Sequence, residues 1–411
     1  MNVDVLVVGA GPAGLAAAIE LRRAGAGHVL VAEREEVAGG VPRHCQHTGF
    51  GARDLRRVLA GPAYARRYAA AARRAGAEIR TGTTVTGWAG DRELTLTSPH
   101  GIETVRAAAV LLATGCRERP RPARLVPGSR VPGIMTTGEL QQRVYLRGQR
   151  LPGRAVVVGA EHVSFSAVVT LAHAGAAVAG LVTGYPAQQS FRAFELGARL
   201  RWHAPVWANT LVSRVVAASG EARLAGVELA DTRTGAARFV ACDLLVFTGD
   251  WIPDHELARL GGVPVDPGTR GPAVDTALET GTPLVFAAGN LVHPAETADV
   301  AALSGRHAAR HIAAALARPA PAGPRVPLTV EPPLGWISPS AVRPPLLPPR
   351  GRFLLRCDSF RPAARIEVRQ GTRLLAGARS GRLVPGRPVH LPAAWAAHVD
   401  PAAGPVHIVL A

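Results

Sequence analysis

Two stretches of the chain share one pattern of apolar and glycine residues. Each begins with an apolar run dominated by Val, passes through a glycine-containing turn, and then shows helical composition before a second apolar run. The first stretch spans residues 3–33 and the second spans 155–182. A continuous apolar run before a glycine turn is typical of a strand buried in a parallel sheet. Each stretch therefore predicts a strand–helix–strand unit, and their repetition predicts an internal duplication.

Later apolar runs extend this duplicated plan. Residues 110–115 and 244–249 each resemble a buried strand that ends in Thr-Gly, and the two segments therefore echo one another. A further strand is expected at 284–289, followed by a helix over 299–317. This alternation of strands and helices predicts the α/β fold class, with parallel sheets covered by helices in three-layer, Rossmann-like domains.

The pattern changes after this helix. Residues 318–350 contain 11 prolines, which predicts an extended or loose connector. The final segment, 351–411, alternates apolar and polar positions, for example in Arg365-Ile366-Glu367-Val368-Arg369. Period-2 alternation is typical of half-buried strands. We therefore expect a small C-terminal β module.

Composition and charge add little to this picture. The chain has 47 Lys+Arg against 30 Asp+Glu, a formal charge of +17, and its sequence contains no lysine. The arginines are scattered, and no RNP, zinc-finger or basic-zipper pattern is present, so a coding bias explains the charge better than nucleic-acid binding. No apolar run reaches the length of a membrane span, and the N-terminus lacks the basic region of a signal peptide.

The cysteines exclude several kinds of redox and metal motif. There are four, at Cys45, Cys116, Cys242 and Cys357, and none forms a C-x-x-C pair. The sequence therefore offers no zinc knuckle, dithiol motif or local iron–sulfur run, and we expect no metal site. Reduced, separate cysteines fit a cytoplasmic protein.

The first glycine turn has the spacing of a dinucleotide site. Residues 9–14 read G-x-G-x-x-G between a strand and a helix. Gly9 allows the tight turn, Gly11 lets a pyrophosphate approach the backbone, and Gly14 allows close helix–strand packing. Glu33 follows at the end of the next strand, where a carboxylate can accept hydrogen bonds from ribose hydroxyls. A glycine turn without a nucleotide is the alternative.

With these residues in view, the sequence resembles the FAD flavoproteins with two dinucleotide-binding domains, the group of thioredoxin reductase and the disulfide reductases. Three segments carry the resemblance: 9–14 with Glu33, the Ala-Thr-Gly segment 113–115, and 286–290, which is similar to a segment beside the ribityl-phosphate of FAD. The resemblance covers residues 3–317. It implies FAD as cofactor.

The resemblance also implies how the domains are divided. An FAD-binding domain would be split between 1–120 and 246–317, with an NAD(P)-binding-like domain inserted at 121–245. The connector at 318–350 and the β domain at 351–411 would follow. The two nucleotide-binding domains are thus interleaved along the chain.

By this resemblance a set of residues is expected to hold FAD. Asn290 stands where the group has Asp, and its amide can still hydrogen-bond a ribityl hydroxyl. Thr297 and Ala298 open a helix whose positive end should face the pyrimidine edge of the flavin. The full set is Gly9, Gly11, Pro12, Ala13, Gly14, Glu33, Arg34, Gly40, Arg43, Val85, Ala113, Thr114, Gly115, Gly289, Asn290, Thr297 and Ala298.

A narrower resemblance rests on segments 39–44 and 159–164. Both look like the FAD subunits of complexes that oxidise amino acids and opines, such as opine oxidase, hydrogen cyanide synthase and dye-linked proline dehydrogenase. It implies three partners: a second flavoprotein of the complex, a small iron–sulfur protein and a small-molecule substrate. Such proteins often carry a C-terminal cysteine cluster, and this chain has only Cys357 there.

Two departures bear on the chemistry. Pro42 and His47 stand where disulfide reductases place their redox cysteine pair, so dithiol exchange is not expected. In the second glycine turn, Glu161 replaces the second glycine and Ser164 the third, and no acid or arginine for a ribose follows. A carboxylate there would repel a pyrophosphate. NAD(P)H is therefore a doubtful ligand, and a vestigial domain or one rebuilt for another nucleotide such as ATP is the alternative.

Two histidines are candidates for proton transfer beside the flavin. His44 and His47 lie in the loop that resembles the one facing the isoalloxazine, and imidazole titrates near neutral pH. Arg43 is suited to a phosphate or an acidic substrate. The alternative for either histidine is a solvent-exposed loop position. His293 is a weaker candidate of the same kind.

These observations favour the FAD-dependent, electron-relaying subunit of a multi-subunit dehydrogenase acting on an amino acid, amine or hydroxy acid. Electrons would pass to an acceptor other than NAD. A stand-alone NAD(P)H-dependent flavin reductase is a rival, and it requires Glu161 to be tolerated beside a pyrophosphate. A non-catalytic nucleotide-binding scaffold subunit is a second rival, which predicts bound FAD that no donor reduces.

Overall fold

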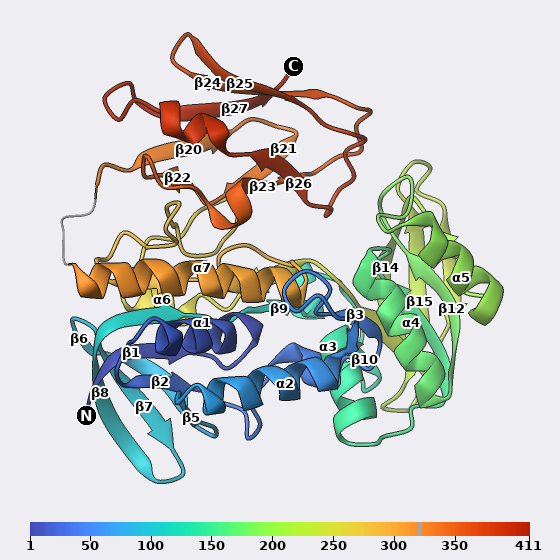
Figure 1. Cartoon of the computed structure of the whole chain (residues 1–411). Helices are drawn as coiled ribbons and strands as arrows, with labels where there is room; N and C mark the ends of the chain where they lie inside the picture. The colour runs from blue at the N-terminus through green and yellow to red at the C-terminus, as the bar shows by residue number, and fades with distance from the viewer. Residues whose placement is uncertain (319–322) are drawn as a thin grey trace. The chain divides into compact units, whose positions relative to one another are not determined.

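The computed structural model describes residues 1–318 and 323–411, and the chain divides into two compact units (Figure 1). One unit contains residues 1–116 and 253–411, and the other contains 117–252. The inserted unit is therefore longer at both ends than the expected 121–245. The chain enters and leaves it through two short strands that pair with each other, β9 (Cys116–Glu118) and β18 (Trp251–Pro253).

The first unit is built on a sheet with a parallel centre. Strands β5, β2, β1 and β8 are adjacent and parallel, and β19 pairs with the second half of β8. β1 and β2 are apolar and largely buried, as strands covered on both faces must be. The elements up to β8 are β1 (Asn2–Val8), α1 (Pro12–Arg23), β2 (Val29–Ala32), η1 (Val41–His44), β3 (Thr48–Phe50), β4 (Leu59–Ala60), α2 (Gly61–Arg74), β5 (Glu78–Arg80), β6 (Thr84–Gly90), β7 (Glu93–Ser98) and β8 (Gly101–Leu112).

The chain returns to this sheet after the insertion and adds a long helix. The returning elements are α6 (Glu256–Leu260), β19 (Val285–Ala287), η4 (Gly289–Leu291) and α7 (Ala298–Ala317). Helix α7 packs along α1, as Figure 1 shows. A methyl group at Gly305 would lie 2.0 Å from the carbonyl oxygen of Ala13, so the two helices touch backbone to backbone at this point. The position of α7 is thereby coupled to the glycine turn that precedes α1.

The second unit repeats the plan of the first. Its five-stranded sheet has the order β10-β17-β11-β12-β13, with apolar clusters on both faces. Its elements are η2 (Arg121–Arg124), β10 (Ile134–Thr136), α3 (Thr137–Gln141), η3 (Gln142–Leu146), β11 (Gly153–Val158), α4 (His162–Ala174), β12 (Ala176–Val182), α5 (Arg192–Trp202), β13 (Val206–Trp207), β14 (Thr210–Ala217), β15 (Leu224–Asp231), β16 (Ala237–Ala241) and β17 (Leu244–Phe247).

The C-terminal β module begins earlier than expected. Residues 319–322 of the expected connector lie outside the described residues, but 326–342 of it contributes three strands to the module. In β20 the alternation of buried and exposed positions places Pro327 on the exposed side, and most of the other prolines in 323–350 lie between strands. A high proline content therefore marks turns here instead of a linker.

The module is made of two sheets around one apolar core. Their strand orders are β22-β20-β27-β24-β25 and β21-β23-β26. The elements are β20 (Val326–Val330), β21 (Leu334–Ser338), β22 (Ala341–Val342), η5 (Pro349–Gly351), β23 (Arg352–Cys357), β24 (Arg365–Gln370), β25 (Arg373–Arg379), β26 (Val389–Pro392), η6 (Ala394–His398) and β27 (Val406–Leu410). The module belongs to the same compact unit as the N-terminal sheet.

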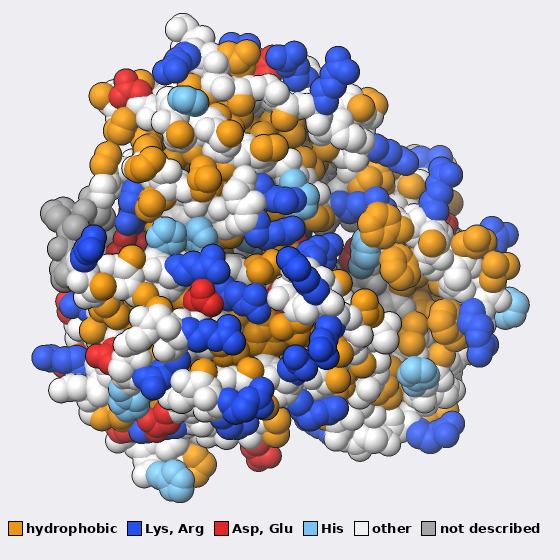
Figure 2. Space-filling model, in the orientation of Figure 1, with side chains coloured by type: hydrophobic (Ala, Val, Ile, Leu, Met, Phe, Trp, Pro, Cys, Tyr) orange, Lys and Arg blue, Asp and Glu red, His pale blue; other side chains and the backbone are white. Residues whose placement is uncertain are grey.

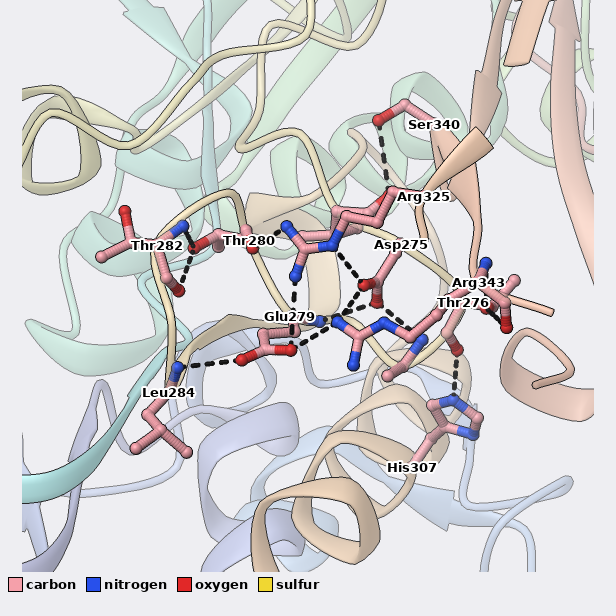
Figure 3. Close-up of polar contacts among 12 residues, drawn as sticks. Asp275, Thr276, Glu279, Thr280, Thr282, Leu284, His307, Arg325, Ser340 and Arg343 are labelled. Carbon is pink, nitrogen blue, oxygen red and sulfur yellow. Dashed lines mark hydrogen bonds and ion pairs between the residues drawn. The ribbon is translucent and has the colours of Figure 1, made fainter. Parts of the chain in front are cut away.

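A buried ion cluster joins the module to the rest of its unit (Figure 3). Asp275 and Glu279 precede β19, and each pairs with both Arg325 and Arg343 of the module. Asp275 is completely buried, and burial raises its pKa although both arginines oppose this effect. Because each acid pairs with both arginines, and each arginine with both acids, the four groups can stay ionised away from water.

Arginine side chains are spread over the face of the molecule seen in Figure 2, with apolar and uncharged side chains between them. This scatter agrees with the absence of a basic motif in the sequence. Among the described residues, none of the helices is both long enough and apolar enough to cross a membrane.

Candidate cofactor site

The first glycine turn lies at the carboxyl end of β1, and each of its glycines has a separate steric reason. Gly9 has a φ of +104°, and a methyl group there would lie 2.6 Å from the carbonyl oxygen of Ala113. A methyl group at Gly14 would lie 1.9 Å from the carbonyl oxygen of Gly9. At Gly11, the N-cap of α1, a methyl group would meet no atom within 4 Å. The space over Gly11 is therefore open to a ligand.

Glu33 lies beside this turn, where β2 ends. Its side chain is buried, and one carboxylate oxygen accepts the backbone N–H of Ala10 at 2.8 Å. The other accepts the backbone N–H of Glu35 at 2.9 Å. These bonds fix the carboxylate next to the glycine turn, and each oxygen retains a second lone pair for a ribose hydroxyl. Pro12 and Ala13 open α1 on the other side of the turn.

The loop 39–44 lies against the same turn. Gly40 has a φ of +62°, and a methyl group there would lie 2.9 Å from the Cα of Gly11. Arg43 donates to the carbonyl of Val37 and lies 3.5 Å from the carboxylate of Glu35. The Nε of Arg43 is buried and has no hydrogen-bond partner among the described residues. A buried N–H that lacks a partner, next to the open turn, is suited to donate a hydrogen bond to an acceptor on a ligand.

The two candidate histidines have different environments. His44 closes η1 and is buried, whereas His47 is exposed. The ring of His47 stacks on Phe50 with centroids 5.1 Å apart, and its Nδ1 lies 2.9 Å from the carbonyl oxygen of Thr48. His47 therefore matches the alternative of a solvent-exposed loop position more closely than His44 does. A role in proton transfer remains a prediction for both.

The Ala-Thr-Gly segment, 113–115, lies where the chain leaves the first unit, and it bonds to Asp254, where the chain returns to that unit. Thr114 donates its hydroxyl to the carbonyl of Asp254 at 2.8 Å, and the N–H of Asp254 donates to the carbonyl of Gly115 at 2.9 Å. Asp254 also lies 3.8 Å from Arg34, which is mostly exposed. Val85, the remaining candidate in this region, is half-buried in β6 and packs against the core of the unit.

Gly289 lies between the start of α1 and the middle of α7. The N–H of Gly289 donates to the hydroxyl of Ser304 at 3.1 Å, and a methyl group at Gly289 would lie 2.8 Å from the Cβ of Ala13. Asn290 uses its carboxamide within the loop: it accepts the N–H of Glu296 and donates to the carbonyl of Glu296, both at 3.1 Å. These two bonds close the 290–297 loop.

An aspartate at the start of α7 was not among the sequence candidates. Asp299 is buried, accepts the hydroxyl of Thr297, and accepts the backbone N–H of Arg53 at 3.1 Å. The guanidinium of Arg53 lies 3.2 Å from the same carboxylate. The positive end of α7 is therefore already partly balanced by a carboxylate. An acidic residue in the first turn of a predicted helix was the sequence signal that could have indicated it.

Two tyrosines of α2, also absent from the sequence candidates, hold the neighbouring loop. The hydroxyls of Tyr64 and Tyr68 both donate to Asp54, at 2.7 and 2.6 Å, and Tyr64 also lies 3.2 Å from the carbonyl oxygen of Ala298. Burial raises the pKa of both tyrosines, so they remain hydrogen-bond donors at any physiological pH. Sequence periodicity alone gives no signal for these contacts.

The residues of the first unit fit FAD. Of the candidates, the glycine turn, Glu33, Gly40, Arg43 and Gly289 lie next to one another around α1. The open space at Gly11, the fixed carboxylate of Glu33 and the unpartnered Nε of Arg43 match a pyrophosphate, a ribose and a further acceptor.

The second glycine turn has nearly the same backbone conformation as the first at the helix N-cap, but a different residue stands there. The N-cap of α4, Glu161, has φ −93° and ψ −178°, and the N-cap of α1, Gly11, has φ −79° and ψ −174°. Glu161 thus stands in the place of Gly11. Its carboxylate accepts the N–H of Ala160 at 3.0 Å and the hydroxyl of Thr248 at 2.6 Å. Glu161 and Ser164 also form a capping box at the start of α4.

The strand register shows which residue of the first unit corresponds to Thr248. Val8 pairs with Leu112 in the first sheet, and Val158 pairs with Phe247 in the second. Thr248 therefore corresponds to Ala113, and the expected echo of Thr248-Gly249 with Thr114-Gly115 was one residue out of register. The hydroxyl of Thr248 also lies 2.7 Å from that of Ser164. The carboxylate of Glu161 is thus held by the side chain of Thr248, where the first turn has the open space at Gly11.

A second carboxylate of this unit is also unusual. Glu118 is buried and accepts the N–H of Gly138 at 2.7 Å. Burial raises the pKa of Glu118 to about 7, with a further increase from Glu161, although the N–H of Gly138 acts in the opposite direction. Two acidic groups near the turn make its surroundings unfavourable for a phosphate.

The glycine turns and their sheets agree with one known family. Residues 3–305 match the model of the pyridine nucleotide-disulphide oxidoreductases. The chain belongs to this family. Its members typically bind FAD, in agreement with the residues around the first turn.

Curated relatives of this chain are subunits of larger enzymes. It is 32% identical to an opine oxidase subunit of Agrobacterium tumefaciens over 49% of this chain and 39% of that one. It is 33% identical to the HcnB subunit of hydrogen cyanide synthase from Pseudomonas aeruginosa over 44% of this chain and 38% of that one. The alpha subunit of sarcosine oxidase from Corynebacterium sp. (strain U-96) is 29% identical over 62% of this chain and 27% of that one. The matches thus span less than two fifths of each relative.

Solved structures show the same fold. Thioredoxin reductase from T. acidophilum superposes with a TM-score of 0.64 and 22% identity, over 77% of this chain and 99% of that one. Bacillithiol disulfide reductase from Bacillus cereus gives a TM-score of 0.62 and 20% identity, over 76% of this chain and 99% of that one. The fold expected from the sequence, α/β with Rossmann-like domains and a C-terminal β module, is confirmed.

Proposed function

We propose that the chain is an FAD-dependent, electron-relaying subunit of a multi-subunit dehydrogenase that acts on an amino acid, an amine or a hydroxy acid. The family and the names of its relatives support this proposal. The partners proposed are a second flavoprotein and a small iron–sulfur protein. We propose that the complex works in the cytoplasm.

The observation that carries the proposal is the difference between the two glycine turns. The first is open above Gly11, whereas the second is filled by the carboxylate of Glu161. A nicotinamide dinucleotide bound in the usual way would place its pyrophosphate where this carboxylate lies. Two negative groups at one helix N-terminus repel each other. The second unit therefore does not supply electrons from NAD(P)H in this proposal.

In this proposal four residues of the first unit have assigned roles. Gly11 and the N-terminus of α1 accept the pyrophosphate, and Glu33 accepts the ribose hydroxyls. Arg43 offers its buried Nε to an acceptor of the cofactor or of an acidic substrate. FAD, when bound, supplies the acceptance of two electrons and their later release. Of the two histidine candidates for proton transfer, His44 fits the proposal better, because its side chain is buried in the 39–44 loop whereas His47 is exposed.

The lack of a cysteine pair in this loop agrees with the proposal. Cys45 is a buried thiol, and Pro42 and His47 occupy the positions of the redox pair. The substrate of a disulfide reductase would find no thiol pair to exchange with. Electrons must then reach and leave the site through a partner or a small molecule.

An anaerobic titration tests the proposal. The purified chain, loaded with FAD, is mixed with NADH and then NADPH while the flavin absorbance is followed, and dithionite is added last. We expect no bleaching by either nucleotide and full bleaching by dithionite. Rapid bleaching by NADH or NADPH would contradict the partner-fed subunit and favour a nicotinamide-dependent reductase. Failure to bind FAD would contradict the cofactor assignment itself.

A further inference from the structure

The C-terminal β module contacts the first unit's sheet region at a second point, away from the ion cluster of Figure 3. Arg356 in β23 and Trp336 in β21 are cross-strand neighbours. Both side chains are buried, and the guanidinium carbon of Arg356 lies 5.3 Å from the centroid of the Trp336 ring. They face the 290–297 loop, which immediately precedes α7.

Arg356 contacts this loop through its charge. Its Nη2 lies 2.9 Å from a carboxylate oxygen of Glu296 and donates to the carbonyl of Ala295 at 3.2 Å. The side chains of Arg356 and Glu296 are only 7% and 6% exposed. Burial lowers the pKa of Arg356, and the negative charge of Glu296 opposes this effect. Arg356 and Glu296 therefore form a buried ion pair. Removing either side chain leaves the other charge buried and unpaired, which destabilises the protein.

The same loop has two further contacts, one within itself and one with the module. Asn290 forms two hydrogen bonds with the backbone of Glu296, and the ring of His293 stacks on Trp336 with centroids 5.6 Å apart. Burial lowers the pKa of His293 to about 3, so this ring is neutral and packs as an apolar group. The backbone of Ala295 has a φ of +59°, a conformation that a residue with a Cβ adopts only when its surroundings impose it.

The pair is not arranged for stability alone. The Nη1 of Arg356 is buried and has no hydrogen-bond partner among the described residues. An unsatisfied buried donor costs stability, and an apolar contact would hold two surfaces together without that cost. A charged contact is directional, and here it selects one carboxylate and one backbone carbonyl of the 290–297 loop.

We propose that Arg356 is a positioning residue for the flavin, and that the β module thereby forms part of the FAD site. Arg356 holds Glu296 and Ala295, these hold the 290–297 loop, and the loop sets where Thr297 and the N-terminus of α7 lie. This inference rests on the proposed function, because it assumes that FAD binds beside α7. It concerns a module that lies outside the region matched to the family model, residues 3–305.

The test compares two variants that each weaken one attachment of the same module. R356Q removes the charge that holds the 290–297 loop, and R343Q weakens the ion cluster with Asp275 and Glu279 without touching that loop. FAD affinity is measured on the full chain by quenching of flavin fluorescence, and the visible circular dichroism of bound FAD reports the surroundings of the ring. We expect R356Q to weaken FAD binding by tenfold or more and to change the dichroism, and R343Q to change the affinity less than twofold.

Three results would overturn the inference. Equal loss of FAD affinity in both variants would show that the module only stabilises the fold. Unchanged affinity and dichroism in R356Q would show that the pair has no influence on the flavin. If R356Q does not fold, E296Q is measured, since its amide keeps the hydrogen-bond acceptor and loses the charge, and wild-type behaviour of E296Q would have the same meaning. A wild-type chain that binds no FAD contradicts the proposed function instead.

Discussion

The hydroxyl of Thr248, at the end of β17, donates a 2.6 Å hydrogen bond to the carboxylate of Glu161, the N-cap of α4. The two residues are 87 positions apart in the chain. In the first unit the corresponding residues are Ala113 and Gly11, and neither has a side chain that could make such a bond. The second turn therefore differs from the first at two positions whose side chains bond to each other.

This relationship predicts the effect of removing Glu161. In E161A the N-cap carboxylate and its bonds to Ala160 and Thr248 are lost, so the stability of the second unit should fall by about 1–2 kcal/mol. FAD affinity should not change, because the first turn is untouched. Thermal unfolding and flavin fluorescence measure the two effects. E161Q, which keeps an acceptor oxygen, should lose less stability, and a loss of FAD binding in either variant would contradict the assignment of FAD to the first unit.

The open space at Gly11 predicts that a larger side chain there would weaken FAD binding without impairing folding. Gly11 has a φ of −79°, and a methyl group there would meet nothing within 4 Å, so G11V should fold with a nearly unchanged thermal midpoint. Its side chain would occupy the space assigned to the pyrophosphate, and FAD affinity should fall at least a hundredfold. The matched control is G14A, whose methyl group would lie 1.9 Å from the carbonyl oxygen of Gly9. G14A should lose stability whether or not FAD is present.

The raised pKa of Glu118 predicts a pH-dependent stability. In the folded chain the pKa of this carboxyl is about 7, above the usual value of 4.5, so the folded state binds the proton more tightly than the unfolded state does. Its contribution to stability is present in full below pH 4.5 and is lost as the pH rises through 7. E118Q should therefore be more stable than the wild type at pH 8, by up to about 3 kcal/mol, since one pKa unit is about 1.4 kcal/mol. Thermal midpoints measured from pH 5 to pH 8 should diverge. Parallel curves would contradict the prediction.

The ion cluster around Asp275 predicts a large cost for neutralising one acid. In D275N, Arg325 and Arg343 lose a completely buried partner. Breaking a buried pair in this way costs about 3–5 kcal/mol. The exposed pair of Glu221 and Arg223 is the control, and E221Q should leave the thermal midpoint nearly unchanged, because water screens these charges. Thermal unfolding followed by circular dichroism compares the two, and similar small shifts in both would contradict the account of the cluster.

Part of the site followed directly from local sequence. The turn 9–14 and Glu33 were recognisable because the conformation of a tight turn and the spacing of an acid at the next strand end depend on neighbouring residues only. The same logic identified Glu161 as a departure from the pattern. The roles of His44 and His47 could not be separated in this way, because only packing made one buried and the other exposed.

Other parts could not be read from local patterns. The prolines of 318–350 predicted a connector, yet 326–342 forms three strands. β20 and β21 pair with β27 and β23, which lie much later in the chain, and β22 pairs with β20. Asp299 and its partner Arg53 are 246 positions apart in the chain, with the whole second unit between them. The register that matches Thr248 with Ala113 required the paired strands of both sheets. Composition contains no information about such pairings.

The order of residues alone specifies the α/β class, the duplicated strand–turn–helix plan, the first glycine turn and the altered second one. These features depend on backbone conformation and on the size of side chains a few residues apart, which are local properties. The contact of Glu161 with Thr248, and that of Arg356 in the β module with the loop before α7, became visible in the three-dimensional structure. These contacts join residues far apart in the chain, and they form only when packing brings distant elements to within hydrogen-bond distance.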